Sequence, residues 1–73
     1  MPLFESQARK DLQDWGVSEE EALDVAATGK VTYEHYVSPY DGWTVREKTI
    51  DGRRISLVHS NDDRITRVRV LSS

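Results

Sequence analysis

The chain has 73 residues, no cysteine and a formal net charge of −3, which excludes a second domain, a disulfide framework and the usual zinc ligand sets. Residues 1–42 carry three basic and nine acidic side chains, a net charge of −6, whereas residues 43–73 carry seven basic and four acidic ones, a net charge of +3. This asymmetry favours an anionic partner for the second half, while the negative total argues against a general nucleic-acid coat protein.

The first predicted element is a helix over roughly residues 3–15. Its apolar residues recur at helical spacing, and Pro2 suits the first turn of a helix. Gly16 follows the last apolar residue, Trp15, and is typical of a helix end because glycine adopts the left-handed conformation easily. The apolar positions are Phe4, Ala8, Leu12 and Trp15.

A second helix is predicted over about residues 19–28. Ser18 and Glu21 have the spacing of a capping box, in which each side chain bonds to the other residue's backbone amide. The three glutamates at residues 19–21 also face the positive end of the helix dipole. Gly29 is expected to end this helix.

From Lys30 the apolar period changes from 3.6 to 2, which predicts strands instead of helices. Turn-forming residues divide this part into four segments, at residues 31–37, 43–49, 53–60 and 64–71. The sequence therefore predicts a single α+β domain, residues 1–73, in which two N-terminal helices pack on one face of a twisted antiparallel sheet of about four strands.

The face that each side chain occupies depends on the turn between the second and third strands. A two-residue turn at Asp51-Gly52 would pair Arg46 with Leu57, and a three-residue loop from Ile50 to Gly52 would pair Val45 with Leu57. We prefer the second register because it separates apolar from charged side chains. A four-residue loop from Asn61 to Arg64 would then pair Leu57 with Val68 and Ile55 with Val70. Together these pairings predict a covered face with Trp43, Val45, Ile55, Leu57, Val68 and Val70. They predict an open face with Arg46, Lys48, Arg54, Ser56, Arg67 and Arg69.

A cluster of arginines on a rigid sheet suits phosphate, because each guanidinium is a planar fork of donors that stays charged. RNA backbone is then the natural ligand, with Lys48 and Arg54 as anion-binding residues and Tyr36 as a stacking surface for a base. The alternative is an ordinary solvated strand face that is partly neutralised by Glu34 and other carboxylates.

His35 and His59 are the side chains that titrate near neutral pH without a large shift. Both fall on the apolar side of their strands, which favours a packed, hydrogen-bonded role over catalysis. His59 remains a candidate acid or base because it ends a strand beside the loop at residues 61–63. The acidic pair in that loop is most simply a solvated turn, and we expect neither a metal nor a cofactor.

The segment from Leu12 to Ala22 and the ending Arg67-Val68-Arg69-Val70-Leu71-Ser72 resemble BrnT-type toxins and related small RelE-like domains. In that family a first helix ends in a Gly-Val-Ser turn, a second helix contains Glu-Ala, and the last strand reads Arg-Ile-Arg-Ile-Ile-Ser. The resemblance covers nearly the whole chain. It implies a RelE-like ααββββ fold and a ribonuclease toxin that acts on RNA or the ribosome, halts translation and is neutralised by a cognate antitoxin.

Carried over by position, the resemblance implies a catalytic set of Arg46, His59, Arg67 and Arg69. Two features depart from the family: Trp15 stands where a basic residue is usual, and Arg46-Glu47 reverses the order Glu-then-Arg. The sequence also ends before the family's closing segment, so we expect binding more than cleavage.

Two other functions stay open at this stage. The first is a non-catalytic phage or mobile-element protein that binds and inhibits a host protein, and the second is an oligomer formed through the last strand. The beginning of the sequence has neither the basic nor the apolar segment of a signal peptide. We therefore expect a cytoplasmic protein without a membrane segment.

Overall fold

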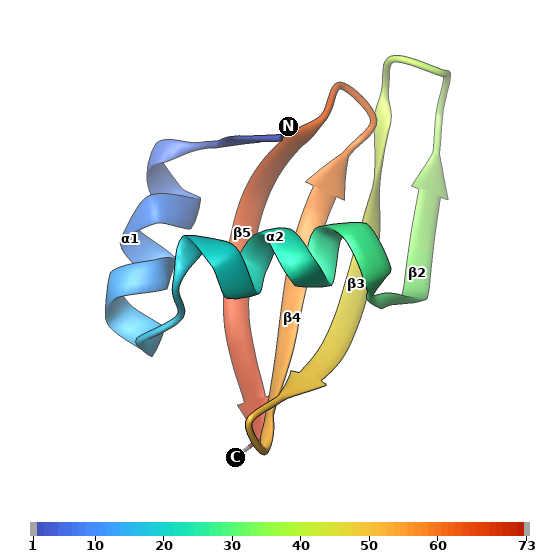
Figure 1. Cartoon of the computed structure of the whole chain (residues 1–73). Helices are drawn as coiled ribbons and strands as arrows, with labels where there is room; N and C mark the ends of the chain where they lie inside the picture. The colour runs from blue at the N-terminus through green and yellow to red at the C-terminus, as the bar shows by residue number, and fades with distance from the viewer. Residues whose placement is uncertain (1, 73) are drawn as a thin grey trace.

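A computed structural model describes residues 2–72 and shows an α+β fold with two helices and a mixed sheet of five strands (Figure 1). The elements are β1 (Leu3–Phe4), α1 (Ser6–Trp15), α2 (Glu19–Thr28), β2 (Lys30–Tyr36), β3 (Gly42–Ile50), β4 (Arg53–Ser60) and β5 (Arg64–Ser72). The strand order in the sheet is β1-β5-β4-β3-β2, and all neighbours are antiparallel except β1 and β5.

The strand β1 corrects two expectations from the sequence, the number of strands and the start of the first helix. Leu3 and Phe4 lie parallel to the beginning of β5, and the amides of Leu3 and Glu5 donate hydrogen bonds to the carbonyls of Asp63 and Ile65. Pro2 therefore precedes a strand, and α1 begins only at residue 6. A long-range pairing of this kind leaves no local signal in the sequence.

The second helix has the predicted bounds, 19–28, and the predicted capping box. The Glu21 amide donates to Ser18 Oγ at 3.1 Å, and the Ser18 amide donates to Glu21 Oε1 at 3.0 Å. Gly16 ends α1 with φ 65°, in the left-handed conformation expected of it. Both signals are local, and for that reason the sequence alone predicts them.

The turn between β3 and β4 has two residues, and the preferred register with a three-residue loop is wrong. Asp51 and Gly52 have φ 51° and 78°, which suits the mirror-image turns that match the twist of a hairpin. Arg46 consequently pairs with Leu57, and Lys48 pairs with Ile55. Because neighbouring side chains alternate between faces, the two cations lie on the covered face.

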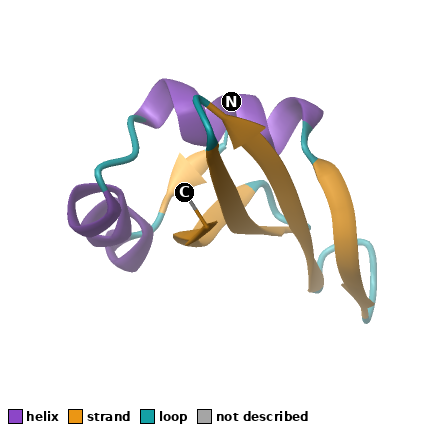
Figure 2. Ribbon diagram, turned by 90° about the horizontal axis from the view of Figure 1, so that it is seen from below, coloured by secondary structure: helices purple, strands orange, loops and turns teal. Residues whose placement is uncertain are grey.

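The core lies between the helices and one face of the sheet. Figure 2 shows α2 lying against that face and α1 beside it, next to β5 in Figure 1. The predicted pairing of Leu57 with Val68 and of Ile55 with Val70 is confirmed. The buried apolar residues are Ala8, Leu12, Val17, Ala22, Val25, Ala26, Ile55, Leu57, Ile65 and Val68. Neither helix within residues 2–72 has the length and apolarity needed to cross a membrane.

A carboxylate from α1 accepts a backbone hydrogen bond at the outer edge of β5. Beyond the two residues that pair with β1, Asp11 Oδ2 accepts a hydrogen bond from the Val68 amide at 3.0 Å and one from Arg67 Nε at 2.9 Å. Asp11 is only 3% exposed. Burial raises the pKa of Asp11, but the bonds from Arg67, Val68 and Gln7 outweigh it and hold the pKa below its ordinary value.

Candidate functional site: the open sheet face

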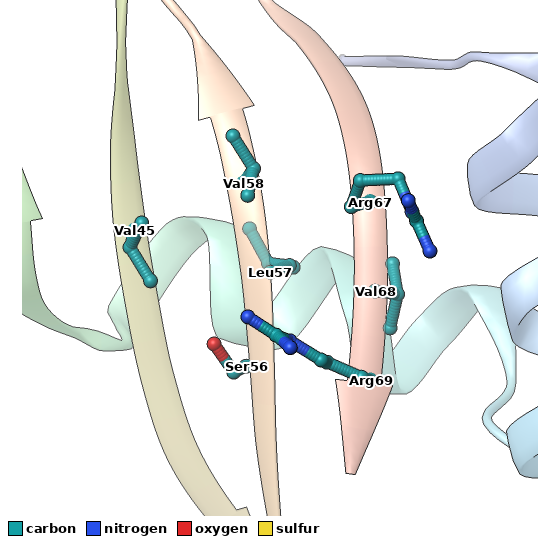
Figure 3. A pocket seen from close by; sticks show the side chains of 7 residues that line it. All are labelled: Val45, Ser56, Leu57, Val58, Arg67, Val68 and Arg69. Carbon is teal, nitrogen blue, oxygen red and sulfur yellow. The ribbon is translucent and has the colours of Figure 1, made fainter. Parts of the chain in front are cut away.

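The face of the sheet opposite α2 is the candidate site. Figure 3 looks onto this face, with α2 behind the strands. Its side chains follow from the strand pairing, in which Val58 lies between Val45 and Arg67, and Ser56 lies between Glu47 and Arg69. We call this surface the open face, and we define it by Tyr33, His35, Trp43, Val45, Glu47, Arg54, Ser56, Val58, Arg67 and Arg69.

One side of the open face is aromatic. The rings of His35 and Trp43 stack with their centroids 4.3 Å apart and an angle of 25° between their planes. Tyr33 lies two residues before His35, opposite Val45. Tyr33 and Trp43 are 56% and 41% exposed, so both leave much of their ring surface to solvent.

The other side of the open face is basic. Arg69 is exposed and has no side-chain hydrogen bond or ion pair to another residue in the range 2–72. Arg67 binds Asp11 through Nε, yet 60% of its side chain is exposed. Arg54 Nε is 4.0 Å from Glu47 Oε1, a loose and exposed pair that neutralises little.

A cavity of about 190 Å³ lies between these two sides. Its lining residues are Val45, Ser56, Leu57, Val58, Arg67, Val68 and Arg69. In Figure 3 the Arg69 side chain extends from β5 across β4 towards Ser56, whereas that of Arg67 turns the other way. None of the lining residues is acidic, so the cavity favours a ligand that is anionic or accepts hydrogen bonds.

The expected positions of Arg46 and Lys48 on the open face are wrong. Arg46 donates from Nη1 to the Gly29 carbonyl at 3.1 Å, where α2 ends, and the Lys48 ammonium binds the Asp24 carboxylate at 2.9 Å. Cations are favourable at a helix C-terminus because the last carbonyls carry partial negative charge. These two side chains therefore fasten α2 to the sheet.

The four residues of the implied catalytic set do not come together. Arg46 and His59 lie on the covered face, and Arg67 and Arg69 lie on the open face. His59 sits at the end of β4 with Nε2 2.8 Å from Asp63 Oδ1, as a hydrogen-bonded side chain. The expected acid or base is thus separated by the sheet from the arginine pair.

The aromatic residues on the open face also differ from the expected one, Tyr36. Tyr36 pairs with Gly42 and points away from His35, so it does not lie on the open face. Tyr33, His35 and Trp43 take its place, and sequence reasoning missed them because it adopted the wrong turn. The Asp51-Gly52 dipeptide was the signal that would have found them, since it is the strongest short hairpin signal known.

Many of the charged residues that make the two halves of the sequence differ form ion pairs with one another in the fold. Acidic residues of the first half pair with basic residues of the second half in four ion pairs within residues 2–72. The pairs are Glu5–Arg64, Asp11–Arg67, Glu21–Arg53 and Asp24–Lys48. The positive charge left for a ligand is concentrated in Arg69 and the exposed parts of Arg67 and Arg54.

No cluster of three or more carboxylate or imidazole side chains suited to a metal ion occurs within residues 2–72. Comparison of the chain with models of known protein families, with curated proteins and with solved structures found no match in any of the three.

Proposed function

We propose that this chain is a RelE- or BrnT-like domain that binds single-stranded RNA through its open face. The observation that carries the proposal is the presence of exposed aromatic rings and of arginines on one uncovered sheet face. Bases stack on aromatic rings whatever their sequence, and guanidinium groups bind the phosphates between them. The strands β3, which carries Trp43, and β5, which carries Arg67 and Arg69, are two strand spacings, about 10 Å, apart across the sheet. Along the strands, Trp43 lies two residues from Val45, which faces Val58 and then Arg67.

The kinship is supported by the motifs at residues 12–22 and 67–72 and by two helices that precede antiparallel hairpins. The reversed Arg46-Glu47 pair supports binding without cleavage. Neighbouring residues of a strand point to opposite faces, so the reversed order places a carboxylate on the open face and the arginine beneath α2. The proposal therefore assigns phosphate binding to Arg67 and Arg69 and assigns no residue to proton transfer.

Replacing Trp43 with alanine tests this proposal against a matched control. We expect the affinity for a fluorescein-labelled oligouridine to fall roughly 5- to 150-fold, since a stacked base contributes about 1–3 kcal/mol. Trp15→Ala, at a residue 47% exposed at the end of α1, should leave the affinity unchanged. The measurement is fluorescence anisotropy at several salt concentrations. Equal effects of the two substitutions would contradict the proposal.

The salt dependence adds a readout for the arginines. If Arg69 contacts one phosphate, Arg69→Ala should reduce the slope of log affinity against log salt by about 0.7. An unchanged slope would remove Arg69 from the binding surface.

A second candidate function is the docking of a partner protein, such as an antitoxin or a host protein, on the hairpin of β2 and β3. The three tyrosines of the chain, Tyr33, Tyr36 and Tyr40, all lie in this hairpin and are 56%, 65% and 85% exposed. Tyrosine is enriched in protein interfaces, and β2 is an edge strand of the sheet.

The hairpin can be tested with the product of the neighbouring gene as the partner. We expect the purified pair to co-elute, and we expect the double substitution Tyr36→Ala and Tyr40→Ala to separate it while Trp15→Ala does not. Co-elution that survives the double substitution, or no co-elution at all, would count against this second function.

A further inference from the structure

The cavity on the open face contains a polar group that the fold does not use. Ser56 is 5% exposed, and its hydroxyl has no hydrogen-bond partner among residues 2–72. The hydroxyl is nevertheless open to the cavity, because the one buried side-chain nitrogen or oxygen without a partner among these residues is Arg46 Nε. The Ser56 hydroxyl can therefore bond a ligand or water. It lines the cavity beside the Arg69 guanidinium, which has no ion pair with a carboxylate of residues 2–72 (Figure 3).

The lining combines two kinds of surface. Val45 and Val58 supply apolar side chains on neighbouring strands, while Ser56 and Arg69 supply hydrogen-bond donors on one side. A lone phosphate could accept hydrogen bonds from Ser56 and Arg69, but its charged oxygens would also lie against the apolar side chains of Val45 and Val58. A flat ring with apolar faces and acceptor atoms along one edge would match both surfaces.

We infer that this cavity is a binding site for one unstacked nucleobase, and that it selects guanine. The inference rests on the proposed function, because it places the base of a bound RNA strand. On a strand without guanine, such as oligouridine, Arg69 binds a phosphate, and where guanine is present Arg69 binds that base instead. The site thus adds sequence preference to a surface whose other contacts, aromatic stacking and phosphate binding, are indifferent to sequence.

Guanine follows from the chemistry of arginine. The guanidinium is a rigid fork that only donates, and guanine presents two adjacent acceptors, O6 and N7. Adenine places an amino donor beside its N7, which faces the donors of Arg69 unfavourably. Arg67 is the less suitable reader because its Nε is bonded to Asp11 and its side chain turns towards α1 (Figure 3).

The test uses oligouridine decamers that carry one central guanine, adenine, cytosine or 7-deazaguanine. We expect the strand with guanine to bind about tenfold more tightly than oligouridine, the discrimination typical of one bidentate arginine contact. The 7-deazaguanine strand lacks the N7 acceptor and should lose most of that advantage.

Two substitutions locate the preference within the cavity. Arg69→Lys keeps the positive charge but loses the planar pair of donors. The ratio of the affinity for the guanine strand to that for oligouridine should therefore approach one, and the affinity for oligouridine should fall less than the affinity for the guanine strand. Ser56→Ala removes the free hydroxyl and should reduce the preference, whereas Arg9→Lys on the exposed side of α1 should keep it. Chemical shifts of the Ser56 and Arg69 amides should respond most strongly to the strand that contains guanine.

The outcomes separate this inference from the proposed function. Equal affinity for all the decamers would overturn the guanine site and leave RNA binding in place. A guanine preference that persists in Arg69→Lys would also overturn it. Failure of every decamer to bind would overturn both.

Discussion

Replacing Leu57 with alanine should lower the free energy of unfolding by about 3 kcal/mol, which is a large part of the stability of so small a domain. Leu57 lies in β4, and its side chain, on the covered face of the sheet, belongs to the core and is 1% exposed. Its truncation therefore leaves a cavity in the core. Val45→Ala on the open face should cost less than about 1 kcal/mol, because Val45 is only partly buried. Urea unfolding followed by circular dichroism measures both values.

This pair of substitutions discriminates between the two registers of the β3–β4 hairpin. In the two-residue turn Leu57 lies across from Arg46, and Val45 lies on the opposite face. With a three-residue loop Val45 would join Leu57 in the core. Similar losses of stability for Leu57→Ala and Val45→Ala would therefore contradict the described register.

Replacing Asp11 with alanine should lower the free energy of unfolding by about 2 kcal/mol. The change leaves the buried Val68 amide without an acceptor, which is costly, whereas the Arg67 guanidinium, on a side chain that is 60% exposed, can turn to solvent. Asp14→Ala, on an exposed position of the same helix, should change stability by less than about 0.5 kcal/mol. Urea unfolding at neutral pH compares the two variants.

The contribution of the Asp11 carboxylate to folding stability should depend on pH. Because the pKa of Asp11 is below its ordinary value in the folded state, its contribution is present above the unfolded pKa and is lost as the pH falls through the folded pKa. The stability difference between the wild type and Asp11→Ala should thus shrink below about pH 4. A difference that stays constant down to pH 2 would contradict this role of the carboxylate.

The helices could be predicted from the sequence because their signals are local. The capping box at Ser18 and Glu21 and the left-handed Gly16 each act within one helical turn. The strand β1 could not be predicted in the same way. It has two residues, and it exists because the chain returns at Arg64 to pair with Leu3.

The register was harder to predict because two physical preferences conflict. Separating apolar from charged side chains favours a three-residue loop, whereas the Asp51-Gly52 dipeptide favours a two-residue turn. The turn chemistry prevails because the covered cations find partners, Arg46 at the Gly29 carbonyl and Lys48 at Asp24. Those partners lie in α2 and at its C-terminal end. The position of α2 over the sheet does not follow from the pattern of the strands alone.

The prediction of which side chains share the open face was correct for the part that depends on the β4–β5 pairing. Arg67 and Arg69 lie on the open face as expected, since Leu57 pairs with Val68 in both the prediction and the structure. The aromatic side was missed because Trp43 follows the β3–β4 register. The result is a smaller basic surface than expected, joined to an aromatic one.

The most direct test of the open face as an RNA-binding surface is a titration of single-stranded RNA into isotope-labelled protein, followed by amide chemical shifts. Binding at the open face predicts that the largest shifts occur at Tyr33, Trp43, Ser56 and Arg69. The exposed surface of the two helices, residues 6–15 and 19–28, should shift least. Shifts that concentrate on the helices, or no shifts at saturating RNA, would contradict the account.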